Sequence, residues 1–273
     1  MKLNLSVRKI AEITGAELIS SAPDTVVTSF VTDSRVVAPG DAFIALKGQK
    51  HDARKFIPDV LSKGAAVILA EKGFEVPQKA NASFLLVEDS LKALQALAKY
   101  HRLNSTLKVA AITGSNGKST TKQMLRAICE TAGETAANMG NFNNQFGVPF
   151  SLLEIQPKHK YGIFELGASH PGDILETASL AVPDVAVITN VGPSHLEFFH
   201  DLETIYKTKT EIAQCLNFGG TLVYNADDEY LSRLKTEFKG KSLSFGFHPG
   251  ADLQILDTEK FSFTYKGEAY VLD

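Results

Sequence analysis

The sequence has only two cysteines, Cys129 and Cys215, among its 273 residues. This scarcity excludes the disulfide framework that stabilises many small secreted domains. Both cysteines lie in stretches that are predicted to be helical. We therefore expect buried free thiols in a reducing compartment, which points to the cytoplasm.

The sequence also lacks a long hydrophobic run. The longest apolar stretches, such as AAVILA at residues 65–70, have the length of a strand, whereas a membrane-spanning helix needs about 20 residues. The opening residues, MKLNLSVRKIAEITG, have neither the sustained apolar core nor the cleavage site of a signal peptide. We expect neither export nor a membrane span.

No charge of either sign dominates the chain. There are 28 Lys and Arg residues against 31 Asp and Glu, and the sequence pI is near 6.2. This balance gives no electrostatic basis for binding a duplex nucleic acid or an anionic membrane surface. Small molecules are the favoured partners, and we expect a monomer.

The order of apolar patterns predicts an α/β protein of two domains. Residues 1–104 alternate short apolar strands with amphipathic helices, and a polar stretch, RLNSTLK, follows the last helix. Residues 105–273 continue with strands KVAAIT, YGIFELGA, PDVAVITN and GTLVYNAD, separated by helical stretches. Such alternation predicts a mostly parallel sheet with flanking helices, which binds ligands at the carboxyl ends of its strands. The tail FSFTYKGEAYVLD predicts a hairpin around Lys266 and Gly267.

The stretch AAITGSNGKSTTKQML, residues 110–125, carries the strongest functional signal. Gly114 and Gly117 follow a predicted strand, so the backbone can curl and aim successive amides at a phosphate, while the next helix adds its positive end. Lys118 can neutralise outer phosphates, and the Ser119 hydroxyl can join the shell of Mg²⁺. The strict P-loop pattern needs a glycine where Ile112 stands, but the shorter pattern T-G-x-x-G-K-[ST]-T fits. The alternative is a glycine-rich turn with an incidental lysine.

Two later strand ends bring candidate metal ligands. Glu165 lies in GIFELGASHPGD and His195 in VITNVGPSHLE, each where a predicted strand meets its loop. In a parallel sheet these ends adjoin the phosphate loop, so both side chains could reach a metal there. Each alone could instead be a solvated glutamate or a structural histidine.

Three further segments keep two interpretations. Lys207 and Lys209 lie near the start of a predicted apolar-periodic helix, where residue chemistry favours a solvated charged face. The asparagine-rich stretch NMGNFNNQFGVPFSLLE could hold an oxyanion or phosphate, or could be a plain turn cluster before a helical or extended segment. In the first domain, a basic, donor-rich loop pair could grip a diphosphate or could be ordinary surface charge; it contains Ser34, Arg35, Lys47, Gln49, Lys50 and His51.

Taken in order, ITGSNGKSTTK, GNFNNQFGVP, FELGASHPGDI, TNVGPSHLEFF and KTKTEI, preceded by TDSRVVAPGDAFIALKG, resemble the Mur ligases of peptidoglycan synthesis. The likeness spans nearly the whole chain and is strongest to the branch that joins D-Ala-D-Ala to UDP-MurNAc-tripeptide. It implies an N-terminal UDP-substrate domain and a central P-loop domain. The implied activity is ATP-dependent amide ligation: the γ-phosphate moves to a peptide carboxylate, and an amine attacks the acyl phosphate.

The resemblance also implies roles for individual residues. The residues that would take part in catalysis are Lys118, Lys209 and His195, and Lys209 stands at the position that relatives carbamylate. Magnesium would be bound by Ser119, Glu165 and His195. The UDP end of the substrate would be bound by Ser34, Arg35, Gln49, Lys50 and His51. ATP binding falls to Thr113, Gly114, Ser115, Asn116, Gly117, Lys118, Ser119, Thr120 and Asn144.

Members of this family continue with an adenine-contacting helix and a third domain, so the resemblance implies an incomplete central domain. We expect the 273-residue polypeptide to bind ligands without turning over. Alternatives are a sister ligase that adds the third stem residue, a folylpolyglutamate synthetase-like ligase, a non-catalytic nucleotide-sugar-binding fragment, and a generic P-loop NTPase.

Overall fold

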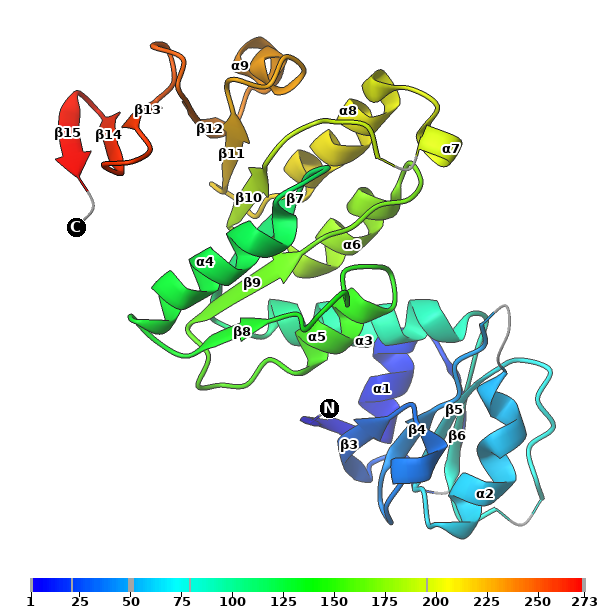
Figure 1. Ribbon diagram of the computed structural model, residues 1–273. Helices are drawn as coiled ribbons and strands as arrows, with labels where there is room; N and C mark the ends of the chain where they lie inside the picture. The colour runs from blue at the N-terminus through cyan, green and yellow to red at the C-terminus, as the bar shows by residue number, and fades with distance from the viewer. Residues whose placement is uncertain (1, 21, 49–51, 79, 195, 272–273) are drawn as a thin grey trace. The chain divides into compact units, whose positions relative to one another are not determined.

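The computed structural model describes residues 2–20, 22–48, 52–78, 80–194 and 196–271 (Figure 1). The chain forms two units by its internal contacts. The first comprises residues 1–105 with 152–154, and the second comprises residues 106–151 with 155–273. Each unit contains its own sheet.

The first unit is built on a six-stranded sheet of order β1-β3-β4-β5-β6-β2. Neighbouring strands from β3 to β6 run parallel, and β1 and β2 close the two edges in antiparallel pairing. The strands are β1 Lys2–Ser6, β2 Glu17–Ile19, β3 Val26–Val31, β4 Ala42–Ile44, β5 Val67–Glu71 and β6 Ser83–Val87.

Local sequence explains where the helices of the first unit begin and end. Ser6 caps α1 (Val7–Thr14) by accepting the Lys9 N–H, and Gly15 ends it in the left-handed region. Asp89 caps α3 (Ser90–Leu103), whose buried residues include Leu94, Leu97 and Ala98. The remaining helical segments are η1 Ser34–Val36, η2 Ala53–Phe56 and α2 Ile57–Ser62.

The second unit contains a nine-stranded sheet of order β15-β14-β13-β12-β11-β10-β7-β9-β8. All neighbours from β8 to β13 are parallel, and β13, β14 and β15 form an antiparallel meander. The strands are β7 Lys108–Thr113, β8 Thr135–Ala137, β9 Tyr161–Glu165, β10 Val185–Ile188, β11 Thr221–Asn225, β12 Lys241–Gly246, β13 Leu253–Asp257, β14 Ser262–Tyr265 and β15 Glu268–Val271.

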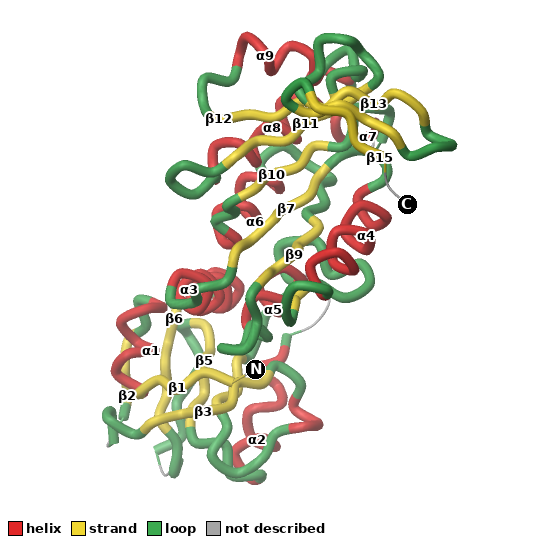
Figure 2. Tube along the Cα trace, turned by 90° about the vertical axis from the view of Figure 1, so that its left-hand side faces the viewer, coloured by secondary structure: helices red, strands yellow, loops and turns green. Residues whose placement is uncertain are grey.

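Helices cover both faces of this sheet, as Figure 2 shows: α4 lies on one side, and α6 and α8 lie on the other. The helical segments are α4 Lys118–Glu130, α5 Gly147–Leu153, α6 Asp173–Ala181, α7 Leu196–Phe199, α8 Leu202–Thr210, η3 Glu211–Cys215, η4 Leu231–Arg233 and α9 Leu234–Glu237. Register places Thr113 opposite Ile188, and Ile112 opposite Glu165, so β7, β9 and β10 end at the same edge. The predicted α/β class with a mostly parallel, helix-flanked sheet is confirmed.

Of the local predictions, the C-terminal hairpin is confirmed and the burial of the two cysteines is not. The hairpin is confirmed, because Lys266 and Gly267 both adopt positive φ, at 53° and 80°, between β14 and β15. Both cysteines are free and lie in helical segments, but each is partly exposed rather than buried. No helix in the described part of the chain is long and apolar enough to cross a bilayer.

Candidate functional site

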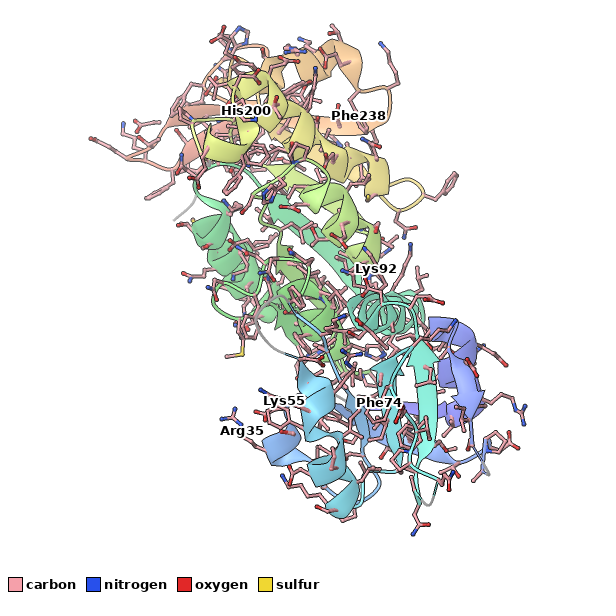
Figure 3. All side chains as sticks on the ribbon, turned by 90° about the vertical axis from the view of Figure 1, so that its right-hand side faces the viewer. Arg35, Lys55, Phe74, Lys92, His200 and Phe238 are labelled. Carbon is pink, nitrogen blue, oxygen red and sulfur yellow. The ribbon has the colours of Figure 1, made fainter. Side chains whose placement is uncertain are left out.

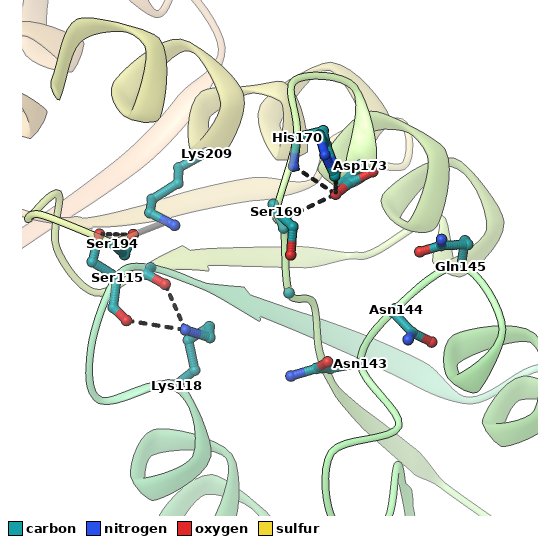
Figure 4. A pocket seen from close by; sticks show the side chains of 13 residues that line it. Ser115, Lys118, Asn143, Asn144, Gln145, Ser169, His170, Asp173, Ser194 and Lys209 are labelled. Atoms are coloured by element: carbon teal, nitrogen blue, oxygen red, sulfur yellow. Dashed lines mark hydrogen bonds and ion pairs between the residues drawn. The ribbon is translucent and has the colours of Figure 1, made fainter. Parts of the chain in front are cut away.

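A cavity of about 390 Å³, here called the strand-end pocket, opens in the second unit at the carboxyl ends of β7 and β9 (Figure 4). Its lining is polar, and Figure 4 shows Lys118 and Lys209 reaching into it from α4 and α8. The lining residues are Gly114, Ser115, Lys118, Asn143, Asn144, Gln145, Gly167, Ala168, Ser169, His170, Asp173, Ser194 and Lys209.

The turn between β7 and α4 depends on two glycines. At Gly114, φ is 149°, and an added Cβ would lie only 1.9 Å from the Thr189 hydroxyl oxygen. At Gly117, φ is 80°, and no atom lies within 4 Å of an added Cβ, so only backbone conformation demands glycine there. Gly114 lets the loop after β10 pack closely against this turn, and Gly117 provides the left-handed backbone conformation at the N-cap of α4.

The amides of this turn divide into two groups. Those of Ser115 and Asn116 donate to the carbonyl and side-chain oxygens of Asn190, at 3.1 and 2.8 Å. In the described part of the chain, no acceptor is recorded for the N–H groups of four successive residues, Gly117 to Thr120. Since the first amides of any helix lack intrahelical partners, these four donors are the ones left for an anion. The predicted phosphate-binding amides are therefore the four at the start of α4, and those of Ser115 and Asn116 are already engaged.

Lys118 folds back on the same turn. Its ammonium donates to the carbonyls of Gly114 at 2.7 Å and Ser115 at 3.2 Å. Burial lowers the pKa of Lys118, and attraction to Glu165 partly opposes that shift. One residue before the turn, the buried Thr113 hydroxyl has no hydrogen-bond partner among the described residues. A cation and an unsatisfied hydroxyl therefore flank the free amides.

Glu165 is the carboxylate of this region, and it is 3% exposed. Its Oε2 accepts a hydrogen bond from the Ser119 hydroxyl at 2.7 Å, and its Oε1 accepts one from the Asn143 amide at 2.8 Å. Lys122 Nζ lies 3.6 Å from Oε2. The structure thus brings together Ser119 and Glu165, two of the three residues predicted to bind a metal.

These two residues fit a magnesium ion that arrives with phosphates. A hydroxyl and a carboxylate are hard oxygen donors, and Mg²⁺ typically takes one or two carboxylates together with substrate phosphates and water. No cluster of three or more His, Cys, Asp or Glu side chains suited to a metal occurs among the described residues. The third predicted ligand, His195, lies outside the described residues.

The asparagine loop, residues 138–146, closes the pocket on another side. The Asn138 side chain bonds to both the N–H and the carbonyl of Glu165, at 3.0 and 2.8 Å, which fixes the loop to the end of β9. Asn144 accepts the N–H groups of Phe146 and Gly147, so its oxygen caps α5. That leaves the amide NH₂ of Asn144 as its part that can meet a ligand.

Lys209 and Lys207 differ sharply, although both lie on α8. The Lys207 side chain is 72% exposed and pairs with Glu203, as a solvated face predicts. Lys209 is 3% exposed, and no acceptor for its ammonium is recorded in the part of the chain that is described. Burial, with a smaller contribution from the charge of Lys118, lowers the pKa of Lys209 to about 8. The solvated-face interpretation is therefore wrong for Lys209.

The substrate residues predicted in the first unit are only partly described. Ser34 is buried at the start of η1, and its carbonyl accepts a hydrogen bond from Lys63 at 2.8 Å. Arg35 projects outward, as Figure 3 shows, and pairs with Asp33 at 2.6 Å. Gln49, Lys50 and His51 lie outside the described residues.

Sequence reasoning missed several residues of the site. Asn143 and Lys122 contact Glu165, and Asn190 accepts hydrogen bonds from the turn between β7 and α4. A spacing signal existed for Lys122, which follows Ser119 by three residues and so shares its helix face. Ser169, His170 and Asp173 line the pocket just after Glu165, where Asp173 accepts the N–H groups of the other two.

Residues 112–272 match the Mur ligase middle domain, and residues 26–102 match the Mur ligase family catalytic domain. The chain is 37% identical over 243 residues to the UDP-N-acetylmuramoyl-tripeptide--D-alanyl-D-alanine ligase of Buchnera aphidicola subsp. Acyrthosiphon pisum, covering 89% of this chain and 52% of the relative. The Escherichia coli (strain K12) ligase of the same name is 35% identical over 228 residues, covering 83% and 49%.

Solved structures give the same result. A crystal structure of MurF from Acinetobacter baumannii superposes with a TM-score of 0.89 at 32% identity, covering 99% of this chain and 60% of that one. MurF ligase from Thermotoga maritima in complex with ADP gives 0.78 at 33% identity, covering 89% and 57%. The chain spans about half the length of the curated relatives it matches. The chain belongs to the Mur ligase family.

Proposed function

We propose that this protein is an ATP-dependent amide ligase of peptidoglycan precursor synthesis that joins D-Ala-D-Ala to UDP-MurNAc-tripeptide. The curated relatives that carry this name support the substrates, and the relative solved with ADP supports a nucleotide. The observation that carries the proposal is local. Four adjacent amides, Gly117 to Thr120, have no recorded acceptor among the described residues and lie at the start of α4, where Lys118 lines the polar pocket and the Ser119 hydroxyl contacts Glu165.

This arrangement suits transfer of a phosphoryl group to a carboxylate. A carboxylate does not form an amide until one of its oxygens becomes a good leaving group. In the proposed reaction a carboxylate oxygen attacks the γ-phosphorus and ADP leaves. The amine then attacks the acyl carbon, loses a proton and expels phosphate. Lys118 and the amides of α4 would neutralise the charge on the transferring group. Ser119, Glu165 and His195 would hold Mg²⁺, which supplies further neutralisation when bound.

We assign Lys209 a role as a carbamate. Its neutral amine would attack the carbon of CO₂ and lose a proton, which converts a buried cation into an anion. A pKa near 8 gives the amine a substantial neutral fraction at mildly alkaline pH. Asn144, at the opposite wall, would meet the nucleotide through its amide NH₂.

We further propose that the two parts of the chain bind different ends of the reacting complex. Residues 105–273 would bind ATP. Residues 1–104 would bind the UDP end of the substrate through a loop cluster that comprises Ser34, Arg35, Gln49, Lys50 and His51.

Isothermal titration of the 273-residue chain with ATP and Mg²⁺, and separately with UDP-MurNAc-tripeptide, tests the proposal. We expect saturable binding of both ligands. A chain that binds the sugar nucleotide and ignores ATP would be a nucleotide-sugar-binding module, and the ligase assignment would be wrong. Binding of ATP alone would contradict the assigned role of residues 1–104.

A further inference from the structure

Lys122 is a buried cation that the proposed reaction does not use. It is 6% exposed and lies on α4 one turn after Ser119. Its ammonium donates to the carbonyls of Asn138 at 3.1 Å and Gly140 at 3.4 Å, and lies 3.6 Å from Glu165 Oε2. An ammonium has three N–H donors, and these three acceptors match them. Lys122 therefore cannot leave without giving up three interactions.

The other groups directed at this carboxylate are neutral. The Ser119 hydroxyl and the Asn143 amide contact its two oxygens. Among the described residues, Lys122 supplies the one cation within ion-pair distance of Glu165, while Lys118 acts on it from farther away. A buried ion pair stabilises a fold no better than apolar packing of similar volume. Stability alone thus gives little reason for a charge at this position.

We propose that Lys122 is a built-in counter-ion that reserves Glu165 for a metal ion delivered with a polyphosphate. In the nucleotide-free chain the ammonium compensates the carboxylate and opposes the binding of a lone divalent cation. The inference rests on the proposed function, because it takes Glu165 and Ser119 as the metal-binding pair. It makes Lys122 a positioning and selectivity residue, because its ammonium contacts Glu165 and two loop carbonyls and would act on the metal through Glu165.

A divalent ion beside Glu165 meets an oppositely charged carboxylate, but it also meets the positive charge of Lys122 in a buried setting, where repulsion is poorly screened. A polyphosphate brings enough negative charge to make the same position favourable. Lys122 also fixes the asparagine loop through two carbonyls, so the loop that carries Asn143 stays in place while the metal exchanges.

Electron paramagnetic resonance of Mn²⁺, which reports free hexaaqua ion, tests this without any turnover. The wild-type chain is titrated with Mn²⁺ alone and with Mn²⁺ plus ATP. Because ATP itself chelates Mn²⁺, a titration of ATP without the chain is subtracted, and we expect the chain to bind Mn²⁺ with ATP at least about tenfold more tightly than Mn²⁺ alone. Equal affinity in the two titrations would overturn the proposal, and this result does not depend on any variant folding.

Lys122→Met removes the charge and keeps most of the volume. We expect it to bind Mn²⁺ alone about tenfold more tightly than wild type, because the carboxylate is no longer compensated. Adding Glu165→Gln to that variant should abolish the gain. Arg126→Met is the matched control on α4, since Arg126 forms an exposed pair with Glu130, and it should match wild type. A purely structural lysine predicts no gain, and a folded Lys122→Met chain without one would contradict the proposal.

The outcomes also separate this inference from the proposed function. If wild type binds no ATP with Mn²⁺, the nucleotide assignment fails. A gain in Lys122→Met that Glu165→Gln removes would still establish the counter-ion. If ATP binds but no gain appears, the counter-ion fails while the nucleotide site stands.

Discussion

The basic residues of the two units are treated differently by their surroundings. In the first unit, Arg35 pairs with Asp33 and Arg54 pairs with Asp52, both at 2.6 Å and each only two residues away. The hydrogen bond from Arg35 lowers the pKa of Asp33 to about 2. These guanidinium charges are matched locally by the residues that precede them.

In the second unit, neither lysine of the strand-end pocket has a carboxylate within ion-pair distance among the described residues. Lys118 donates only to backbone carbonyls, and no acceptor is recorded for Lys209 among the described residues. Desolvation raises the free energy of each charged form, as their lowered pKa values indicate. An anionic ligand would relieve that cost. Positive charge that is at least half-buried and lacks a carboxylate partner among the described residues, rather than the number of basic residues, distinguishes the proposed binding region.

The largest expected effect is the loss of Lys118. We expect Lys118→Met to weaken binding of ATP with Mg²⁺ by about 2–4 kcal/mol, since a buried charge-assisted contact is removed. Isothermal titration measures the change. Lys108→Met is the control, because Lys108 is 75% exposed and pairs with Asp184. This variant should bind ATP with Mg²⁺ as tightly as wild type. Equal losses in both variants would remove the distinction between the two kinds of lysine.

The second effect concerns stability and pH. The pKa of Lys209 is about 8 in the folded chain against an ordinary 10.5, so the unfolded chain binds more protons between those values. Stability therefore rises as pH increases from about 8 towards 10.5, and the burial cost is complete below pH 8. In CO₂-free buffer at pH 7, we expect Lys209→Met to be more stable than wild type by roughly 3 kcal/mol.

Urea unfolding of both chains at pH 7, 8.5 and 10 measures this difference, and other titrating groups cancel in the comparison. The gap should shrink as the pH rises. If the difference in free energy of unfolding between the two chains did not change with pH, protonation of Lys209 would not destabilise the folded chain. Under ¹³CO₂, a new carbamate carbon resonance in wild type alone would support the carbamate.

A third, smaller effect tests the phosphate loop. Gly114→Ala would place a methyl group 1.9 Å from the Thr189 hydroxyl oxygen. We expect a loss of about 1–3 kcal/mol in the free energy of unfolding, part of which Thr189→Ala should restore. Gly117→Ala meets open space, so only its backbone strain of about 1 kcal/mol is expected. Equal losses at the two glycines would argue against the close approach.

The smallest effect is expected at Arg35. Arg35 belongs to the proposed UDP-binding cluster, but its guanidinium already pairs with Asp33 on an exposed surface, so we expect Arg35→Ala to weaken UDP-MurNAc-tripeptide binding by at most about fivefold. Titration calorimetry gives the ratio. A hundredfold loss would mean that Arg35 leaves Asp33 to bind the diphosphate, and the contrast between the two units would no longer hold.

Much of the fold follows from local sequence. Periodicity predicted the helix of α3 and the buried strands β5 and β6, and turn chemistry predicted the hairpin at Lys266 and Gly267. The three-residue strands β2 and β8 were not predicted, because so short a run carries little alternation and is defined by its pairing partners. Cys129 and Cys215 also turned out partly exposed, since helical periodicity does not show how far a neighbour covers a face.

The site was predictable where motif and strand end coincide, and unpredictable where burial decides. Ser119 and Glu165 meet because adjacent parallel strands end at one edge. The burial of Lys209 depends on what packs around α8, which its charged neighbours in sequence conceal. The contacts of Lys122 depend on a loop whose path no local pattern specifies.

The central claim is that the amides at the start of α4 bind polyphosphate, and ¹⁵N–¹H correlation spectra of the chain titrated with ATP and Mg²⁺ test it most directly. The account predicts that the amide signals of Gly117, Lys118, Ser119 and Thr120 shift most, and that those of Ser115 and Asn116, already bonded to Asn190, shift less. Unchanged signals from Gly117 to Thr120 at saturating nucleotide would contradict it.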